Sequence, residues 1–366
     1  MNLTPSIQAL FRSRLLYGLL AVLGVVMLWW MLDQDTLGQL AQVLPQVQPG
    51  WLLLSMGFSL LSSWFRAMRW RLQVRALGYD LSPRESLALV FTGYAVNQFL
   101  PRGGEVLRCT LLARTHAVPF AGAFGTVITD RLLDMLVLLL LTVVAVVFEC
   151  QVLYDWLLAP IAALPSLVPA ALAGLALGAV VAIRWGLRST HTLRLPLPAL
   201  QRLATRLLAG MTSIRQVRPR LPLLLHTLGL WLAYWAMNLT ALLSLGITAD
   251  LPLSLSYFAL LILVTGTLGV SVPTPGGMGP YHAAVMFTFV LFGMGTADTT
   301  AAAWGALFAL LAHGSRMVAL LLAGAIAYIW WVWHHRPAAP ERRWSWFSKI
   351  PETGMTRPPE PVGEKP

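Results

Sequence analysis

The chain has 366 residues, of which 57% are hydrophobic and only 11% are charged, and its mean hydropathy is +0.69. In soluble domains about a quarter of the residues are charged. The composition therefore excludes an ordinary soluble domain and predicts a protein that crosses a membrane several times. The net charge of +11 is carried by arginines that cluster between apolar stretches, a placement typical of cytoplasmic loops rather than of a nucleic-acid-binding surface.

Nine apolar stretches divide the chain, and several approach the length of about 20 residues that crosses a bilayer as a helix. They lie near 15–32, 50–65, 86–100, 121–148, 157–183, 222–246, 256–272, 280–294 and 297–333. We therefore predict an all-α, polytopic integral membrane protein with six to eight membrane helices. Residues 1–336 are expected to form one transmembrane domain, and the Pro-rich residues 337–366 a disordered cytoplasmic tail.

The charges of the connecting segments alternate in sign along the chain. Segments 33–49 and 149–156 contain acidic residues and no Lys or Arg, whereas segments 66–84 and 184–220 are rich in arginine. Basic residues concentrate in the cytoplasmic loops of membrane proteins. The pattern therefore predicts that the arginine-rich segments and both termini lie in the cytoplasm.

The stretch at 86–100 is too short to cross a bilayer. An α-helix of this length reaches about 22 Å, against a hydrocarbon thickness of about 30 Å. Arginines lie at both of its ends, with Arg84 before it and Arg102 after it. A crossing would place one of these basic groups outside, so we expect the stretch to enter the membrane and return on the same side.

Residues 198–218 form an amphipathic pattern. Apolar residues recur at helical spacing on one side, and arginines fall off that side; the apolar positions are Leu200, Leu203, Leu207, Met211 and Ile214. The pattern predicts a helix in the cytoplasmic interface with its basic side chains toward anionic lipid. A soluble connector helix packed on its own loops is the alternative.

Two segments break the apolar pattern in the same way. Residues 97–108 read NQFLPRGGEVLR and residues 273–282 read PTPGGMGPYH, each with a proline just before Gly-Gly at the end of an apolar stretch. Proline removes a backbone donor, and glycine permits positive φ and close approach. Because unpaired backbone groups in lipid cost several kcal/mol each, such a break must be buried in protein or line a wet cavity.

We predict that these two breaks are re-entrant hairpins that enter from opposite faces, as in inverted-repeat transporters with a site at the bilayer midplane. Ordinary Pro-Gly kinks in membrane helices are the alternative. The residues expected to shape the hairpins are Pro101, Gly103, Gly104, Pro273, Pro275, Gly276, Gly277, Gly279 and Tyr281.

Charged residues also lie within the apolar stretches. Asp130, Arg131 and Asp134 stand at the start of the fourth stretch, with both aspartates on one helix face. Arg316 lies between apolar runs, far from either end of the last stretch. A charge at the bilayer centre costs about 2.5–3.5 kcal/mol on insertion scales, so such groups pair or face water. For the aspartates, snorkelling to the nearby headgroup region is the alternative.

Together these segments resemble one family, the membrane domain of bacterial lysylphosphatidylglycerol synthase/flippase and its stand-alone relatives, long called uncharacterised protein family 0104. The matching segments are RAMRW (66–70), NQFLPRGGEVLR (97–108), DRLLDML (130–136) and PTPGGMGPYH (273–282), which cover roughly residues 60–320 in order and spacing. The resemblance implies an all-helical integral membrane protein that moves a lipid or lipid-linked precursor between leaflets in the plasma membrane of a prokaryote.

The chain departs from the family's pattern in two places. The large relatives carry a soluble aminoacyl-transferase domain after the membrane part, whereas only about 30 Pro-rich residues follow here, so we expect no synthase reaction and no enzyme. Many relatives have a Glu shortly after the last glycine of the second break, where this chain has Tyr281 and His282. A proton or headgroup role at that place would fall to His282, because imidazole titrates near neutral pH.

We expect a lipid transporter whose cavity takes an anionic headgroup while the acyl chains stay in the lipid. Guanidinium groups suit phosphate, and the acidic members and the histidine would hold the arginines when the site is empty, or contact an amine or sugar. The expected substrate-binding residues are Arg69, Asn97, Arg102, Glu105, Arg108, Arg131, Asp134, His282 and Arg316. No catalytic residue, metal or cofactor is expected.

Two other functions stay open. One is an accessory subunit of an envelope-lipid synthesis pathway. The other is an intramembrane lipid-modifying enzyme with acid–base groups among His282, His313, Asp134 and Glu105, although the chain has no serine-nucleophile motif and no H-E-x-x-H. The expected partners are membrane lipids with anionic headgroups and not nucleic acid, with self-association or a lipid-synthesis enzyme left open.

Overall fold

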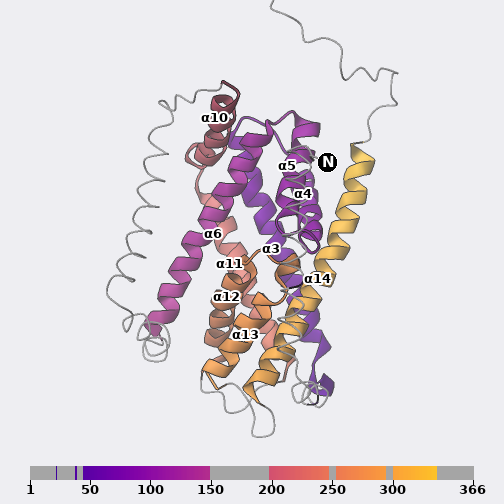
Figure 1. The fold of residues 1–366 in the computed structure, drawn as a ribbon, viewed down its shortest axis with the longest axis vertical. Helices are drawn as coiled ribbons and strands as arrows, with labels where there is room; N and C mark the ends of the chain where they lie inside the picture. Colours follow the sequence, from indigo (N-terminus) through magenta and orange to yellow (C-terminus); the bar gives the residue numbers. More distant parts are fainter. Residues whose placement is uncertain are drawn as a thin grey trace, which may run out of the picture.

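The computed structural model describes residues 44–148, 198–246, 253–293 and 300–335, together with the isolated positions Val22 and Gly38. Within these residues the chain is helical and contains no strand, which confirms the predicted all-α class (Figure 1). The predicted stretches at 15–32 and 157–183 and the tail at 337–366 lie outside the described residues.

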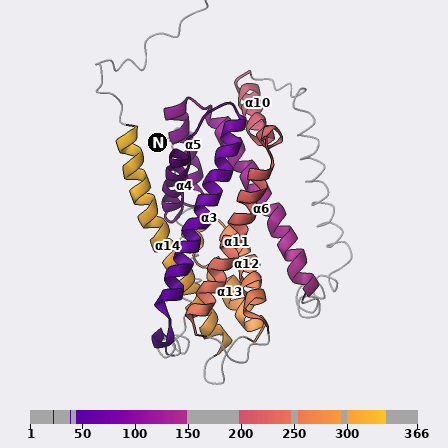
Figure 2. The same ribbon diagram turned by 180° about the vertical axis from the view of Figure 1, so that it is seen from behind.

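The helices follow one another in an order close to that of the apolar stretches. They are the short 3-10 turn η1 (Leu44–Gln46), α3 (Pro49–Ala76), α4 (Pro83–Asn97), α5 (Gly103–His116), α6 (Phe120–Phe148), α10 (Pro198–Thr212), η3 (Ser213–Gln216), α11 (Leu221–Ser244), α12 (Leu255–Ser271), η4 (Pro275–Gly277), α13 (Pro280–Leu291) and α14 (Ala301–His334). The long helices α3 and α14 run along most of the length of the molecule, whereas α4 with α5 and α12 with α13 lie toward opposite ends (Figures 1 and 2).

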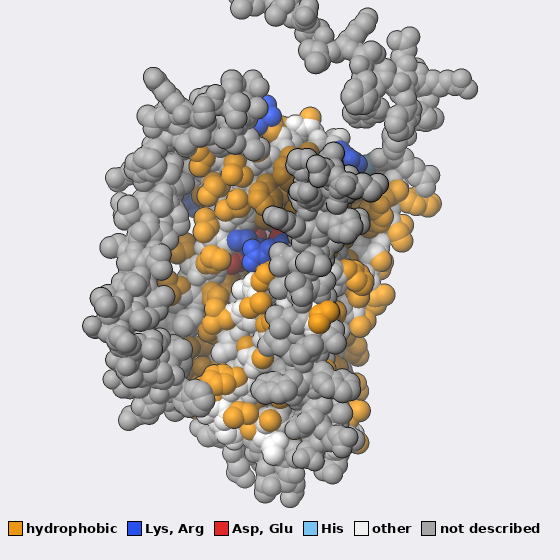
Figure 3. Space-filling model, in the orientation of Figure 1, with side chains coloured by type: hydrophobic (Ala, Val, Ile, Leu, Met, Phe, Trp, Pro, Cys, Tyr) orange, Lys and Arg blue, Asp and Glu red, His pale blue; other side chains and the backbone are white. Residues whose placement is uncertain are grey.

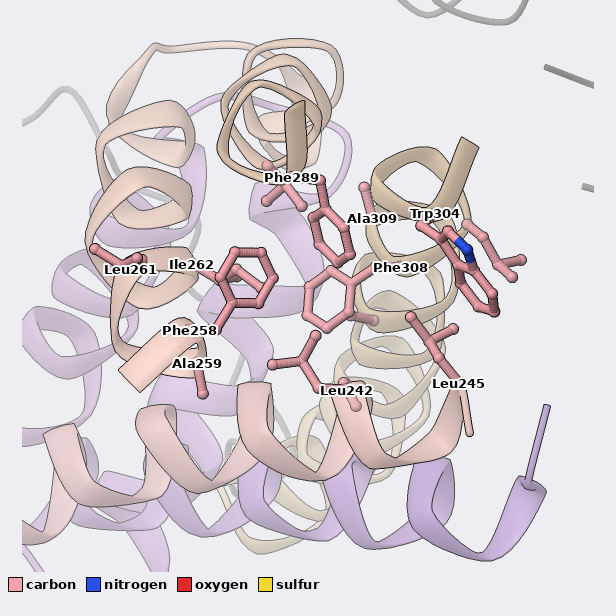
Figure 4. Packing of buried hydrophobic residues seen from close by; sticks show 14 of the residues in the cluster. Leu242, Leu245, Phe258, Ala259, Leu261, Ile262, Phe289, Trp304, Phe308 and Ala309 are labelled. Carbon is pink, nitrogen blue, oxygen red and sulfur yellow. The ribbon is translucent and has the colours of Figure 1, made fainter. Parts of the chain in front are cut away.

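Two apolar clusters occupy these opposite ends. The first, which we call the α12–α13 core, joins α11, α12, α13 and the first half of α14. In it Phe258, Phe289 and Phe308 point toward one another (Figure 4), with ring centroids 4.9 Å apart for Phe258–Phe289 and 5.7 Å for Phe289–Phe308. The second, the α4–α5 core, joins α3, α4, α5, α6 and Trp331 near the end of α14. The polar residues between the two cores are therefore held by helices from both.

Helix α3 packs on α11 through a stripe of buried serines. The stripe consists of Ser55, Ser59, Ser62 and Ser63. The Ser55 hydroxyl donates to the carbonyl of Met237 on α11 at 2.9 Å. Helices in lipid gain little from hydrophobic burial against one another, so small residues that allow close backbone approach carry their packing. A serine stripe on an apolar helix follows that rule.

The first Pro-Gly-Gly break ends one helix and starts the next. Helix α4 begins with a capping box, in which Ser82 and Glu85 bond each other's backbone amides, and it ends at Asn97. Arg102 takes a left-handed conformation with φ of 59°, and α5 then returns along α4. The Asn97 Oδ1 accepts a hydrogen bond from the Gly104 amide at 2.8 Å, which satisfies one donor at the exposed start of α5.

Gly104 is the residue that allows this reversal. A Cβ at Gly104 would lie 1.7 Å from the carbonyl oxygen of Gly93 on α4. Only hydrogen fits at that distance, so the two helices cross at a glycine pair. The second break is built in the same manner: a Cβ at Gly269 of α12 would lie 2.6 Å from the carbonyl oxygen of Pro280 at the start of α13.

Helix α10 does not lie apart from the other helices. A Cβ at Gly210 would lie 2.1 Å from the carbonyl oxygen of Gly122 on α6, and the Thr129 hydroxyl of α6 donates to the Met211 carbonyl at 2.9 Å. The amphipathic helix predicted over 198–218 therefore ends at Thr212 and packs closely on α6, with η3 completing the segment.

Among the described helices, α14 is the one that is long and apolar enough to cross a membrane by length and composition, and α12 is a shorter apolar helix. Helix α3 has the length, but Arg66, Arg69, Arg71 and Arg75 fall in its second half. The number of six to eight membrane helices stays a prediction.

Replacing Gly104 by Ala tests the close crossing of α4 and α5. The added Cβ would overlap the Gly93 carbonyl, so we expect a loss of at least about 1–3 kcal/mol of stability, seen as a lower Tm of the purified protein in detergent. The matched control is Gly57→Ala on the exposed face of α3, where no described atom lies within 4 Å of the added Cβ. That control should be neutral or slightly stabilising, because alanine is favoured over glycine in a helix by about 0.5–1 kcal/mol. Equal Tm values for both variants would contradict the packing.

Candidate functional site

A cavity of about 270 Å³ lies between the two cores, and both helix breaks line it. Its walls come from α4 and α5 with the turn between them, from α12 and α13 with the turn between them, and from α3, α6, α11 and α14. In Figure 3 basic and acidic side chains gather near the middle of the face shown, bordered by hydrophobic side chains. A cavity that combines an apolar lining with several charged side chains is the candidate for a functional site.

The polar residues behind the cavity form a charge cluster that joins α3 to α6. Arg66 and Arg69 lie one turn apart on α3, and Asp130 and Asp134 lie one turn apart on α6. Each arginine contacts each aspartate at 2.7 Å. We call these four residues the Arg–Asp cluster. Arg69 and Asp130 are fully buried in it, and Asp134 reaches the cavity.

The spacing of the cluster explains its geometry. Residues three or four apart on a helix share a face, so two arginines on α3 meet two carboxylates on α6 as a matched set. Arg69 donates to the two carboxylates through Nε and Nη2, whereas Arg66 donates to both through Nη1. Because removing one partner would leave a buried charge without compensation, the cluster sets how α3 and α6 lie against each other. The aspartates are thus paired within the protein, and their side chains do not snorkel toward headgroups.

Arg131 links the cluster to the first break. Its guanidinium forms an ion pair with Glu105 at the start of α5 and lies 3.9 Å from the Asp134 carboxylate. The Arg131 side chain is 40% exposed, far more than its partners. It therefore presents a cationic group to the cavity while Glu105 holds it in place.

The two breaks meet at the cavity. Arg102 of the first break donates to the carbonyl of Ser271 at the end of α12, at 3.3 Å. A Cβ at Gly276 of the second break would lie 3.0 Å from the Gln98 Oε1. Gly276 and Gly277 have φ of 61° and 79°, values that L side chains rarely adopt. The glycines of the second break therefore allow its backbone to approach the turn of the first.

Arg316 of α14 also lines the cavity. Its guanidinium lies 5.6 Å from the ring centre of Tyr234 on α11, and Tyr234 accepts a hydrogen bond from Arg66 at 3.2 Å. Among the described residues no carboxylate lies within ion-pair distance of Arg316; the acidic residues of the cavity all pair with other arginines. Within the same part of the chain, the charged residues of the lining are four arginines and two carboxylates: Arg66, Arg102, Arg131, Arg316, Glu105 and Asp134. The cavity is basic.

The structure brings together six of the nine predicted substrate-binding residues at the cavity wall. They are Asn97, Arg102, Glu105, Arg131, Asp134 and Arg316. Arg69 lies behind the wall in the Arg–Asp cluster. Arg108 is buried in the α4–α5 core with its guanidinium 4.7 Å from the Trp70 ring centre. His282 is buried with its ring 5.3 Å from that of His313, which does line the cavity.

Arg66, Tyr234 and His313 belong to the site but were not among the predicted substrate-binding residues, although His313 was named as an acid–base candidate. Arg66 holds both aspartates, Tyr234 bridges Arg66 and Arg316, and His313 lines the cavity with its ring stacked 4.7 Å from Tyr281. Arg66 was visible in the motif RAMRW, one helical turn from Arg69. Tyr234 gave no signal, since its segment has no motif. Within the described residues, no three His, Cys, Asp or Glu side chains gather as metal ligands.

Comparison with known proteins gives one family and two distant relatives. The family model described as the lysylphosphatidylglycerol synthase TM region matches residues 15–324. A UPF0104 membrane protein of Methanothermobacter thermautotrophicus is 29% identical over 152 residues, 40% of this chain and 45% of the relative. A UPF0104 membrane protein of Methanocaldococcus jannaschii is 29% identical over 109 residues, 29% of this chain and 32% of the relative. The aligned part thus spans less than half the length of either relative, and no solved structure matches the chain.

Neutralising one aspartate tests whether the Arg–Asp cluster holds the fold. Asp130→Asn leaves Arg66 and Arg69 with one carboxylate between them in a buried site, so we expect a loss of about 3–5 kcal/mol of stability, seen as a marked fall of Tm in detergent. The matched control is Asp80→Asn, which removes the exposed ion-pair partner of Arg75 at the end of α3. Such a surface change should alter stability by no more than about 0.5 kcal/mol. A Tm for Asp130→Asn equal to that of the control would contradict the role assigned to the cluster.

Proposed function

This chain belongs to the family of the lysylphosphatidylglycerol synthase TM region, and from that premise we propose that it moves an anionic phospholipid or lipid-linked precursor between the two leaflets of a membrane. The family is a transmembrane region, so the chain is a membrane protein. The observation that supports transport is the basic cavity at the meeting point of the two helix breaks, with Arg316 unmatched by a carboxylate in the described residues.

The substrate group that fits this cavity is a phosphate. Arg131 of α6 and Arg316 of α14 both line the cavity, and a guanidinium fork binds phosphate oxygens through paired hydrogen bonds. Glu105 is the counter-ion of Arg131 while no substrate is bound. A bound phosphate would replace Glu105 as the counter-ion of Arg131. It would also give Arg316 an anionic partner, which the described residues do not provide.

The size of the cavity supports entry of the headgroup alone. Pockets that take drug-sized molecules have about 300–1,000 Å³, and this cavity has about 270 Å³. A phosphate with a small substituent would fit in this volume, whereas the acyl chains would not. In the proposed mechanism the chains remain in the bilayer while the headgroup crosses through the cavity, which screens it from the hydrocarbon.

The two breaks are proposed as the gates. The α4–α5 hairpin and the α12–α13 hairpin belong to different apolar cores and meet through a polar contact, from Arg102 to the Ser271 carbonyl, beside the close approach of Gly276 to Gln98. Polar contacts of this kind can exchange for contacts to water or substrate at little cost. We propose that the hairpins are re-entrant from opposite faces and part alternately, so that the cavity opens to one leaflet at a time.

The orientation follows from the arginines at one end of the molecule. The end of α3, the start of α4, the end of α5 and helix α10 lie toward the same end (Figures 1 and 2), and exposed arginines such as Arg75, Arg84, Arg114 and Arg206 belong to it. By the positive-inside rule we propose that this end faces the cytoplasm of a prokaryotic cell, with both termini on that side. We call it the basic end.

Arg316→Gln tests the proposed headgroup site. Arg316 has no carboxylate partner in the described residues, so its removal leaves no buried acid unpaired and the protein should fold normally. Losing one charge-assisted hydrogen bond of about 1.5–3 kcal/mol should slow the scrambling of a fluorescent anionic phospholipid in proteoliposomes by about 10- to 100-fold. The matched control is Arg114→Gln, an exposed arginine at the end of α5, which should scramble at the wild-type rate. Wild-type scrambling by Arg316→Gln and by Arg131→Gln together would refute the assignment.

A second test asks which lipid stays on the purified protein. We expect mass spectrometry of the co-purified lipids to find anionic, phosphate-bearing lipids enriched over their share of the membrane, and Arg316→Gln to lose that enrichment, because Arg316 faces the cavity without an acid partner in the described residues. Retention of zwitterionic lipid in the same proportion by both proteins would argue against an anion site.

A further inference from the structure

Three helices meet at one carboxylate at the basic end of the molecule. Glu85 lies in the first turn of α4, His116 is the last residue of α5, and His335 caps the end of α14. The Glu85 Oε1 lies 3.2 Å from the His116 Nε2 and 3.1 Å from the His335 Nε2. We call these three residues the Glu85 latch. All three side chains are only about one-fifth exposed, with values of 19%, 19% and 20%.

The hydrogen-bond partners of His335 determine its protonation. Its Nδ1 lies 3.1 Å from the carbonyl oxygen of Trp331, and its Nε2 faces the Glu85 carboxylate. A carbonyl and a carboxylate both accept and neither donates. Both nitrogens of His335 must therefore carry a hydrogen for the two contacts to be hydrogen bonds, which makes the ring an imidazolium.

His116 does not carry the same constraint. Its Nδ1 lies 2.8 Å from the Thr115 hydroxyl oxygen, and its Nε2 faces Glu85. The Thr115 hydroxyl also lies 2.9 Å from the Leu111 carbonyl, and it can turn its hydrogen either to that carbonyl or to Nδ1. A neutral His116 that donates from Nε2 therefore satisfies both of its contacts. The arrangement is one carboxylate between the His335 ring, which needs two hydrogens, and the His116 ring, which needs one.

Glu85 is well suited to stay ionised between them. Its Oε2 accepts from the Ser82 amide at 2.9 Å in the capping box, at the positive end of the α4 dipole. Partial burial acts to raise the pKa of Glu85, but the hydrogen bonds to Ser82 and the contacts with His335 and His116 outweigh it and hold that pKa below its usual value. The carboxylate therefore keeps its charge throughout the range in which imidazole titrates.

We propose that the Glu85 latch is a pH-sensitive contact that holds α4, α5 and α14 together at the basic end of the molecule. When the His335 ring carries both hydrogens, it donates two hydrogen bonds and balances the carboxylate. When a rise in pH removes one of these hydrogens, one of its two contacts becomes an unfavourable contact between two acceptors. The latch then weakens, and α14 separates more easily from the α4–α5 hairpin.

Other charged groups near the latch do not replace it. On α14, His334 is exposed and turns its Nδ1 to the Trp330 carbonyl at 2.9 Å. On α4 and α5, Arg84 and Arg114 are exposed and lie beyond ion-pair distance of Glu85. From α3, Arg71 donates to the Leu81 carbonyl, and Arg75 pairs with Asp80 at 3.5 Å. Within the described residues, the two histidine rings are the titratable groups that face this carboxylate.

The latch bears on the cavity because of what its helices carry. Helix α14 holds Arg316 and His313, and the α4–α5 hairpin holds Asn97, Arg102 and Glu105. Unfastening their common end lets these two walls move relative to each other. The proposal stands on the geometry of the latch alone and does not depend on what the cavity carries.

The test compares the pH dependence of Tm in full-length wild-type protein and in Glu85→Gln. Glutamine at this position keeps the capping box, because a third-residue Gln can bond the cap amide as Glu does, so the variant removes the charge and little else. We expect the Tm of the wild-type protein to fall by about 2–4 °C more than the Tm of the variant between pH 6 and pH 8. His116→Gln with His335→Gln should behave like Glu85→Gln, and His334→Gln, the matched control, like wild type.

A distance measurement keeps the test decisive should a variant be destabilised. Two spin labels report the separation of the ends of α5 and α14. They are attached at the exposed sites Arg114→Cys and Val332→Cys, and the two native cysteines are removed by Cys109→Ala and Cys150→Ala. We expect a narrow distance distribution at pH 6 that broadens at pH 8, and a distribution that is broad at both pH values when Glu85→Gln is added. Equal distributions at the two pH values in wild-type sequence, or equal pH dependence of Tm in wild type and Glu85→Gln, would overturn the proposal.

Discussion

The structure depends on the pairing of buried charge between α3 and α6. Arg66, Arg69, Asp130 and Asp134 are withdrawn from solvent and meet at 2.7 Å in every combination. Burying any one of these charges without a partner would cost several kcal/mol of desolvation free energy, whereas in the set of four each charge has a partner of opposite sign. Such a cluster tolerates few arrangements of its two helices, because a rotation of either would separate a charge from its partner. The orientation of α6, and with it the position of Arg131, follows from this constraint.

A second constraint acts on the backbone. Both helix breaks bring main chain to main chain at distances that admit only glycine, at Gly104 against Gly93 and at Gly269 against Pro280. The polar groups released by each break find partners within the protein, as the Gly104 amide does at Asn97. This is the condition that an apolar solvent imposes on irregular backbone. The breaks therefore lie where a polar cavity and the facing turn can receive them.

These two constraints explain why the cavity is basic and lies midway between two apolar cores. The aspartates pair with the arginines of α3, and Glu105 pairs with Arg131, so the remaining cations at the cavity, Arg102 and Arg316, have no acid in the described residues to balance them. The excess of positive charge is thus a consequence of how the acids are shared. A phosphate-bearing headgroup is the natural counter-ion for such a site, which is why the proposed function and the Arg–Asp cluster are linked.

Much of this protein could be predicted from its sequence. Composition determined the class, because a chain with so few charges and repeated apolar stretches is stable only as helices in lipid. The proline and glycine pairs at 97–108 and 273–282 located both breaks, since these residues act through their own backbone geometry. The helix faces of Asp130 and Asp134 followed from their spacing. The number of membrane crossings and the predicted stretches at 15–32 and 157–183 are not decided by the described residues.

The tertiary structure decided which of these local features meet. Spacing along the chain shows that Asp130 has a polar face, but its partners Arg66 and Arg69 lie more than 60 positions away. It also shows that His282 follows the second break, but not that its ring lies among buried residues while His313, from another helix, lines the cavity. Tyr234 and the Glu85 latch gave no signal in the sequence for the same reason. Periodicity is a property of one helix, whereas a charge balance or a hydrogen-bond partner is a property of two or more helices, and only their packing specifies it.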